Sequence, residues 1–341
     1  MSLPTSTRQI ILRERPHGQL KSEQMLLRSV PLPELQAGQV LVRVNWLSLD
    51  PLIRIRIGAE PLGGALVPLP IGDPIGGPAV GQVLHAGTSD IPVGSMVEGR
   101  FPWQDYAIMP AEACRQIDTQ GLPPQAALGV LGLPGLTAFT GLHIARQARP
   151  EAKRLIISGA AGAVGSIAGQ LAKIGGWHVT GVANGPDRCA YLRESVGLNV
   201  VLDRSEPAFL SRLADSGPYD VFFDNVGGSM LTDVTGRMAP GGLILICGLM
   251  AQYNRQDRTE DPLALEPFLE TMMGRQLELR TFAAAAHGNQ QDFLDSVVPL
   301  IRAGHLSLPE TIADGIESAP AAFENVFLNG GIGKQLVRLQ V

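Results

Sequence analysis

The sequence predicts an α/β protein with two domains, one rich in β-strands and one built on a doubly wound parallel sheet. A chain of 341 residues exceeds the length at which a single hydrophobic core usually stops growing. Within residues 155–284, short apolar runs alternate with helical stretches of about 10–15 residues, a pattern typical of parallel strands with right-handed crossovers. Residues 1–125 instead carry short apolar segments between Gly and Pro turns.

The expected elements follow from this texture. In the first part we expect strands at 40–49 and 78–87. In the second part we expect strands at 155–158, 177–183, 199–203, 219–228, 243–249 and 276–284, and helices at 166–176, 186–197, 230–242 and 290–303. The tail should return to short strands around 320–327 and 334–341. We therefore predict a discontinuous β-rich domain, 1–125 and 306–341, with the parallel-sheet domain inserted at 126–305.

Composition excludes several classes of protein. The formal net charge of −5 argues against nucleic acid or an anionic membrane as partner. No apolar run approaches the roughly 20 residues that cross a bilayer, and the first residues lack a secretion signal. We expect a cytoplasmic protein. The cysteines Cys114, Cys189 and Cys247 are far apart, and the six histidines form no ligand pair, so we expect neither disulfide nor metal.

A glycine-rich run follows the strand at 155–158 and opens the next helix. In a dinucleotide-binding fold this loop holds the pyrophosphate, because the helix N-terminus offers unpaired N–H groups and a favourable dipole. Gly162 would let the backbone approach the phosphates, and Gly165 would let the helix pack close to the sheet. Ala163 and Val164 lie between them, while Ala160 replaces the first glycine of the usual pattern. The alternative is a tight strand–helix turn without a ligand.

The end of the second strand indicates which dinucleotide is bound. NAD-binding folds usually carry an acid about 20 residues after the loop to hold the ribose 2′-hydroxyl. Residues 180–184 contain no acid, and Arg188 and Arg204 follow, either of which could hold a 2′-phosphate. The alternative is that both arginines are ordinary solvated charges. The missing acid favours NADPH.

Several motifs together resemble one family. They are LSLDPLIR at 47–54, LPGLTAFTGL at 133–142, GAAGAVGS at 159–166, FFDNVGG at 222–228 and CGLMAQYN at 247–254. In order and spacing they resemble the zinc-free branch of the medium-chain dehydrogenase/reductases that holds prostaglandin/leukotriene reductases, plant double-bond reductases and bacterial curcumin-reductase-like enzymes. The resemblance implies a GroES-like domain beside a Rossmann domain, and a homodimer. It also implies NADPH-dependent reduction of the C=C bond of α,β-unsaturated ketones and aldehydes, by hydride transfer to the β-carbon.

The resemblance also implies the site residues. Gly162, Ala163, Val164 and Gly165 match contacts to the pyrophosphate, and Arg188 and Arg204 match positions near the 2′-phosphate. The stretches that match the ribose and nicotinamide contacts contain Asn225, Cys247, Gly248, Tyr253, Phe282, Ala283 and Ala284. Gly331 stands where the family has an Asn, so that a side-chain contact is missing or is supplied by Asn329.

Two side chains are predicted to face the substrate. Tyr253 is the candidate hydrogen-bond donor to the developing enolate oxygen, since a phenol with a pKa of about 10 keeps its proton at neutral pH. Trp46 matches a substrate-contacting aromatic of plant relatives, although a core position is an equal alternative. The segments 46–50 and 72–74, where alcohol dehydrogenases of the superfamily bind zinc, carry no Cys or His. A quinone reductase and a non-catalytic NADPH-binding protein remain the alternatives.

Overall fold

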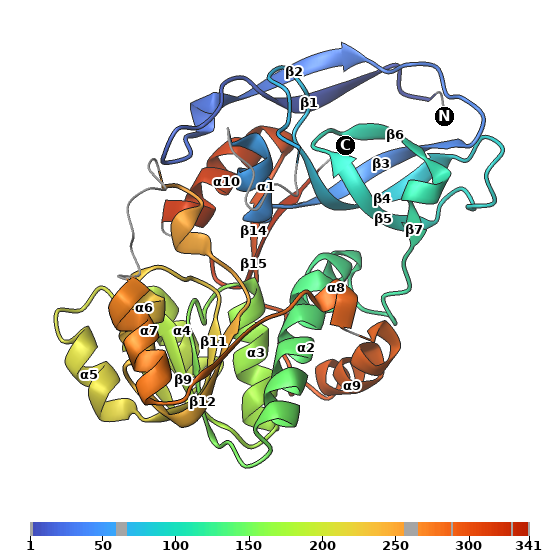
Figure 1. Cartoon of the computed structure of the whole chain (residues 1–341). Coiled ribbons are helices and arrows are strands. Elements are labelled where there is room, and N and C mark those ends of the chain that lie inside the picture. Colours follow the sequence, from blue (N-terminus) through green and yellow to red (C-terminus); the bar gives the residue numbers. More distant parts are fainter. Residues whose placement is uncertain (1–2, 59–66, 256–264, 288, 329, 340–341) are drawn as a thin grey trace. The chain divides into compact units, whose positions relative to one another are not determined.

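A six-stranded parallel sheet forms the centre of the second domain in the computed structural model, which describes residues 3–58, 67–255, 265–287, 289–328 and 330–339 (Figure 1). Its strand order is β10-β9-β8-β11-β12-β13. The strands are β8 (Arg154–Ile157), β9 (His178–Ala183), β10 (Val200–Asp203), β11 (Tyr219–Asp224), β12 (Met238–Ile246) and β13 (Glu278–Thr281). The order reverses between β8 and β11, and open α/β sheets bind ligands at the carboxyl ends of strands beside such a reversal.

Helices connect these strands. They are α2 (Leu133–Ala148), α3 (Ala163–Ile174), α4 (Pro186–Glu194), α5 (Phe209–Ser216), α6 (Ser229–Thr235), α7 (Leu265–Gly274), α8 (Ala284–His287) and α9 (Gln290–Arg302). Helix α2 packs beside α3, and α6 beside α7 (Figure 1). Strand β11 is covered on both faces, because Tyr219, Phe222 and Phe223 are fully buried. This buried strand lies at the centre of the sheet, and the candidate site residues follow the carboxyl ends of it and its neighbours.

The β-rich domain contains a larger mixed sheet and a separate two-stranded one. The larger sheet follows the order β14-β15-β3-β4-β5-β7, with β6 also paired to β3, and the smaller joins β1 to β2. The strands are β1 (Ser6–Leu12), β2 (Met25–Pro31), β3 (Gln39–Ser48), β4 (Gly76–His85), β5 (Met96–Pro102), β6 (Tyr106–Pro110), β7 (Arg115–Gln116), β14 (Glu310–Asp314) and β15 (Lys334–Arg338). Helices α1 (Leu52–Ile57) and α10 (Ala319–Leu328) belong to this domain. Its core includes an edge-to-face contact between Trp103 and Phe323, with ring centroids 5.4 Å apart.

Short 3₁₀ helices complete the secondary structure. They are η1 (Ser22–Gln24), η3 (Ala111–Ala113), η4 (Pro124–Leu128), η5 (Met250–Gln252) and η6 (Ile316–Ser318). The chain divides into two compact units, residues 1–128 with 310–341, and residues 129–309. Among the described residues, no helix is long and apolar enough to span a membrane.

The predicted fold class is confirmed, and three predicted elements are wrong in detail. Residues 320–327 form helix α10 instead of a strand, because Phe323 and Phe327 pack together one helical turn apart, with centroids separated by 5.5 Å. The helix expected at 230–242 ends at Thr235, and β12 already begins at Met238, which pairs with Tyr219 of β11. The strand expected at 276–284 is the shorter β13, after which α8 begins.

Candidate functional site

The glycine loop joins β8 to α3 at the reversal of the sheet. Gly165 is required by packing, since a Cβ there would lie 2.3 Å from the carbonyl oxygen of Gly159 and 2.8 Å from the α-carbon of Ala160. Gly162 is the N-cap of α3, and no side chain caps this helix end. A Cβ on Gly162 would approach only the Gly159 oxygen, at 3.3 Å. The chain itself therefore does not need glycine at 162, whereas a ligand that approaches the backbone does.

The first turn of α3 is open to such a ligand. Ala163 and Val164 are half-buried, and Gly165 behind them is buried. The first N–H groups of any α-helix lack an acceptor within the helix, and the helix dipole favours an anion there. This arrangement fits the pyrophosphate of a dinucleotide.

A buried carboxyl group connects the ends of β8 and β11. Asp224 and Ser158 are both fully buried, and Ser158 Oγ donates to Asp224 Oδ1 at 2.5 Å. The backbone N–H groups of Val226 and Gly227 donate to the same carboxyl group at 3.0 Å. Asn225 donates from its backbone to Ser158 Oγ at 2.9 Å and from Nδ2 to the Ser158 carbonyl at 2.8 Å. The predicted contact residue Asn225 is thus held directly against the start of the glycine loop.

The segment after β12 is attached to the same place. The N–H groups of Cys247 and Gly248 donate to the carbonyl oxygen of Asp224 at 2.7 and 3.1 Å. Farther along, Met250 donates to the Asn225 carbonyl at 3.4 Å, and Tyr253 follows the 3₁₀ helix η5. Gly248 is required here, because a Cβ would lie 2.9 Å from the Asn225 carbonyl oxygen. The structure therefore brings three separately predicted segments, around 162, 225 and 250, to one edge of the sheet.

Burial raises the pKa values of the titratable groups at this edge. It raises the pKa of the Asp224 carboxyl, partly offset by the hydrogen bonds from Ser158 and two backbone N–H groups. Burial, with the nearby charge of Asp224, raises the pKa of the Cys247 thiol to about 12. Burial also raises the pKa of the Tyr253 phenol, against the effect of a backbone hydrogen bond from Leu249. At neutral pH, Cys247 is a thiol without nucleophilic character and Tyr253 is a neutral hydrogen-bond donor.

The last predicted stretch of this domain follows β13. Phe282 is half-buried and packs edge to face on Phe223, with ring centroids 6.0 Å apart. Ala283 is exposed, and Ala284 is buried at the start of α8. Since Phe223 belongs to β11, Phe282 is held near the carboxyl half of the central strands.

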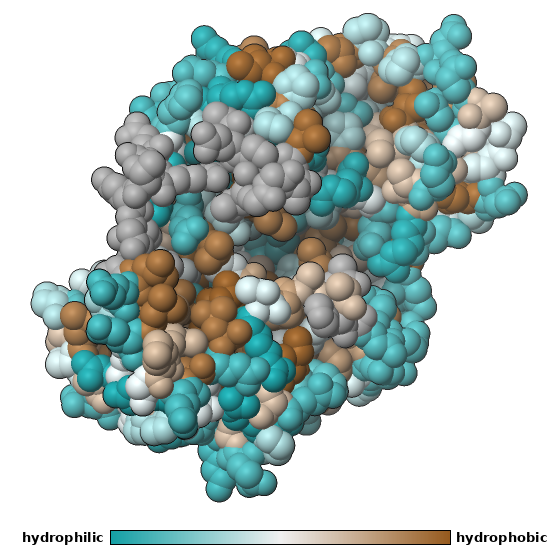
Figure 2. All heavy atoms as spheres, in the orientation of Figure 1, coloured by the Kyte–Doolittle hydropathy of each residue, from teal (hydrophilic) through white to brown (hydrophobic). Residues whose placement is uncertain are grey.

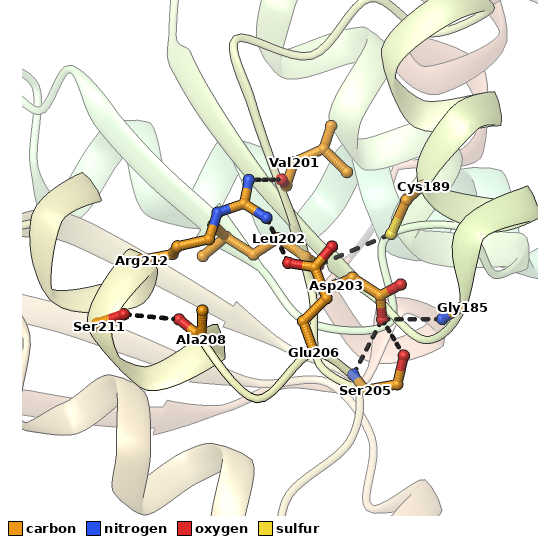
Figure 3. A network of polar contacts seen from close by, with 10 residues as sticks. All are labelled: Gly185, Cys189, Val201, Leu202, Asp203, Ser205, Glu206, Ala208, Ser211 and Arg212. Atoms are coloured by element: carbon orange, nitrogen blue, oxygen red, sulfur yellow. Dashed lines mark hydrogen bonds and ion pairs between the residues drawn. The ribbon is translucent and has the colours of Figure 1, made fainter.

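The two predicted arginines follow neighbouring strands. Arg188 lies in the first turn of α4, is half-buried, and has its pKa lowered mainly by that burial. Arg204 directly follows β10; its backbone N–H donates to the Ala183 carbonyl at 2.9 Å and its Nη2 to Ser229 Oγ at 2.6 Å. The end of β9 carries Ala183 and Asn184, with no acid for a ribose 2′-hydroxyl. Asp203, which the sequence motifs did not single out, has a carboxylate that connects the loops bearing these arginines (Figure 3).

Trp46 and Gly331 belong to the β-rich domain. Trp46 lies on β3, opposite Val80 of β4, and packs against the small cluster of Val80, Leu128 and Leu336. A Cβ on Gly331 would lie 2.4 Å from Thr311 Oγ1, so the Thr311 side chain fills the space that an Asn at 331 would need. Thr311 is fixed there, since its Oγ1 accepts from the Ile332 N–H at 3.0 Å and donates to the Ile332 carbonyl at 2.9 Å. The alternative contact, Asn329, lies outside the described residues.

Models of two protein families match the chain. One, described as the N-terminal domain of an oxidoreductase, matches residues 8–117, and the other, described as a zinc-binding dehydrogenase, matches residues 163–295. Among the described residues, no group of three or more His, Cys, Asp or Glu side chains lies close enough together to hold a metal ion. The expectation of a metal-free protein stays a prediction.

Several enzymes are similar in sequence to this protein over nearly the whole chain. The NADPH-dependent curcumin reductase of Escherichia coli K12 is 32% identical over 97% of this chain and 96% of its own length. The NADP⁺-dependent 2-alkenal reductase of Nicotiana tabacum is 31% identical over 99% of this chain and 98% of its own. Prostaglandin reductase 1 of Rattus norvegicus is 32% identical over 92% of this chain and 93% of its own.

Solved structures agree with these matches. The crystal structure of CurA from Vibrio vulnificus in complex with NADPH has a TM-score of 0.90, 30% identity, and coverage of 98% of this chain and 99% of its own. A quinone oxidoreductase of Pseudomonas syringae, at 18% identity and a TM-score of 0.72, shares the fold. The chain therefore belongs to the medium-chain dehydrogenase/reductase superfamily and, within it, to the family of oxidoreductases that includes the curcumin, 2-alkenal and prostaglandin reductases.

Proposed function

We propose that this protein reduces the activated C=C bond of α,β-unsaturated ketones and aldehydes with NADPH. The observation that carries the proposal is the joining of the glycine loop, Asn225 and the 247–253 segment at one edge of the sheet through Asp224 and Ser158. The full-length relatives, which are named for reducing curcumin, 2-alkenals and prostaglandins, support the substrate class. The alternatives are reduction of quinones and NADPH binding without turnover.

The residues of the Rossmann domain fit NADPH. The uncapped N-terminus of α3 at Gly162 would hold the pyrophosphate. Arg188 and Arg204 would hold the 2′-phosphate, whose charge no carboxylate at the end of β9 opposes. Asn225, the 247–253 segment and Phe282 to Ala284 would line the ribose and the nicotinamide. When bound, NADPH supplies the hydride that adds to the β-carbon of the substrate.

Tyr253 is the proposed donor to the substrate oxygen. As the hydride adds to the β-carbon, negative charge develops on the carbonyl oxygen, and a positioned donor stabilises that charge. Burial raises the pKa of the Tyr253 phenol, so that at neutral pH it keeps the proton that it would donate to a substrate. Trp46 is a second proposed substrate contact, and Gly331 is proposed to contact the cofactor through its backbone, since the space for a side chain there is filled by Thr311. Both roles rest on the family resemblance.

We also propose a homodimer. Strand β13 lies at the end of the described six-stranded sheet and pairs only with β12 there. Figure 2 shows hydrophobic residues gathered over α7, where Leu265, Leu269 and Met273 are exposed. Exposed apolar groups beside an unpaired strand edge are typical of an interface. Light scattering tests this: a mass twice that of the chain supports the dimer, and the mass of one chain contradicts it.

The activity is tested by following NADPH oxidation with a panel that runs from small enals to bulky diarylenones, beside a quinone. We expect turnover of enones and enals that exceeds quinone turnover, a clear preference for NADPH over NADH, and no effect of a chelator. Faster quinone reduction would favour the first alternative. Tight NADPH binding without oxidation on any enone would favour the second, and loss of activity with the chelator would contradict a metal-free reaction.

A further inference from the structure

A buried carboxylate connects the two loops that carry the candidate 2′-phosphate arginines. Asp203 is the last residue of β10, opposite Ala183 of β9, and is 6% exposed. Its Oδ1 accepts from the N–H of Gly185 at 2.9 Å, from the N–H of Ser205 at 2.9 Å and from Ser205 Oγ at 2.6 Å (Figure 3). One oxygen atom thus holds the loop after β9 and the loop after β10 together.

The residues that donate these hydrogen bonds to Asp203 lie close in sequence to the two arginines. Gly185 is the N-cap of α4 and adopts φ +85°, three residues before Arg188. Arg204 stands between Asp203 and Ser205, which are joined by hydrogen bonds from Ser205 to the Asp203 carboxylate. Farther along the second loop, Glu206 pairs with Arg212 at 2.7 Å, and Arg212 donates to the Val201 carbonyl at 3.1 Å. The second loop is therefore held at both ends, while the first is held at the start of α4 by Asp203.

The hydrogen bonds from Gly185 and Ser205 depend on the negative charge of Asp203. Burial of the carboxyl group raises its pKa. The hydrogen bonds from Ser205 and Gly185 together lower the pKa by more than burial raises it, so the net shift is downward. A buried carboxylate without donors would be very costly, which makes the three donors and the charge mutually dependent. An asparagine has the same shape but accepts these hydrogen bonds more weakly.

We propose that Asp203 is a positioning residue for cofactor selection, which sets the spacing of Arg188 and Arg204 so that both reach one 2′-phosphate. This inference rests on the proposed use of NADPH. Asp203 Oδ1 accepts its hydrogen bonds from Gly185 and Ser205, and the proposal assigns it no direct contact with the cofactor. Its effect passes through the loops to the arginines, so it concerns the 2′-phosphate alone and not the rest of the dinucleotide.

The test compares Asp203→Asn with a matched change at the opposite, amino-terminal ends of the parallel strands. Asp220 also holds two backbone N–H groups with one carboxylate oxygen, those of Lys153 and Arg154 at 2.8 and 2.9 Å, at the start of β8. Calorimetry measures the Kd of 2′,5′-ADP and of 5′-ADP for the full-length wild type and both variants. Asp203→Asn should raise the Kd of 2′,5′-ADP at least about fivefold and leave that of 5′-ADP within about twofold, since small displacements of a binding group have large effects. Asp220→Asn should change neither.

A double-mutant cycle shows whether the effect passes through an arginine. In an Arg188→Ala, Arg204→Ala background, Asp203→Asn should weaken 2′,5′-ADP binding by less than about twofold, because the groups that it positions are gone. Equal losses for both ligands, unchanged 2′,5′-ADP binding, or full additivity in the cycle would overturn the inference. Should Asp203→Asn not fold, Ser205→Ala removes one donor and should produce a smaller shift confined to 2′,5′-ADP; no shift would overturn the inference. A wild type that binds both ligands equally would instead contradict the proposed NADPH preference.

Discussion

At the residue scale, the two glycines of one loop respond to different demands. Gly165→Ala would place a methyl group 2.3 Å from the Gly159 oxygen. Since its three nearest neighbours are all backbone atoms, we expect a loss of about 1–3 kcal/mol of unfolding free energy. Gly162→Ala meets only one atom, at 3.3 Å, so we expect nearly normal stability but much weaker NADPH binding. Urea unfolding and NADPH titration of both variants check this. Normal NADPH affinity in Gly162→Ala would place the phosphates elsewhere.

Tyr253→Phe separates chemistry from binding. Loss of one donor to a developing oxyanion costs up to about 10²–10³ in rate where that donor acts alone. The nicotinamide ribose hydroxyl shares this task in the proposed site, so we expect a loss at or below the lower part of that range, with NADPH affinity close to wild type. Single-turnover rates with an enone and NADPH titration provide the two measurements. Unchanged turnover would make Tyr253 a wall of the pocket, and lost NADPH binding would make it a positioning group for the nicotinamide.

Residues that act through contiguous motifs could be predicted, and residues that act through strand adjacency could not. The glycine loop lies within one short stretch, and its role follows from its place between a strand and a helix. Ser158 and Asp224 are 66 positions apart, and only the pairing of β8 with β11 makes them neighbours. Asp203 was overlooked for the same reason, because its partner Gly185 belongs to the preceding loop. A polar residue at the end of a buried strand is the signal that would have found all three.

At the element scale, the C-terminal strand β15 is fixed to the loop after β3 by a buried ion pair. Lys334 Nζ pairs with Asp50, whose Oδ1 also accepts from Ser48 Oγ at 2.9 Å, and the side chains of Lys334 and Asp50 are 5% and 23% exposed. The ion pair and the hydrogen bond from Ser48 together hold Asp50 in the loop after β3. Nearby, Arg54 donates to the carbonyls of Pro16 and Gly18 at 3.3 and 2.7 Å.

Lys334→Met should therefore destabilise the protein by about 3 kcal/mol, because it leaves the Asp50 carboxylate largely buried without its cation. The matched control is Lys334→Met with Asp50→Asn, which keeps an acceptor for Ser48 but removes the unpaired charge and should recover much of the loss. Urea unfolding of the two variants and the wild type measures the difference. If the double variant is no more stable than Lys334→Met alone, the lost stability comes from the ion pair itself and not from the unpaired charge of Asp50.

Element types were predicted well where strands and helices alternate, and poorly in the tail. Residues 320–327 contain Phe, Val and short apolar pairs, a composition that suits a strand as well as a helix. The i, i+4 spacing of Phe323 and Phe327 was the helical signal, and tertiary packing of Phe323 on Trp103 decides the outcome. Helix α2 was not predicted at all, since its motif was interpreted only as a family match.

At the scale of the whole molecule, the two units differ in how the chain completes them. The unit of residues 129–309 is continuous in sequence, whereas the sheet of the β-rich unit contains β15 between β14 and β3. A chain that ends at residue 332 should therefore lose protection of the β3 amides while the β8 amides stay protected. Hydrogen exchange followed by mass spectrometry checks this. Equal loss of protection in both strands would mean that the units unfold together.

The position of β15 also has a consequence for synthesis. A ribosome makes β3 early, but β15, which pairs with Trp46, Leu47 and Ser48, is made only after the whole of residues 129–309. The nascent chain therefore carries an incomplete sheet edge throughout translation of the entire Rossmann domain, and an unpaired edge invites pairing with other chains. The sheet whose first strands are translated early is thus the one that is completed late.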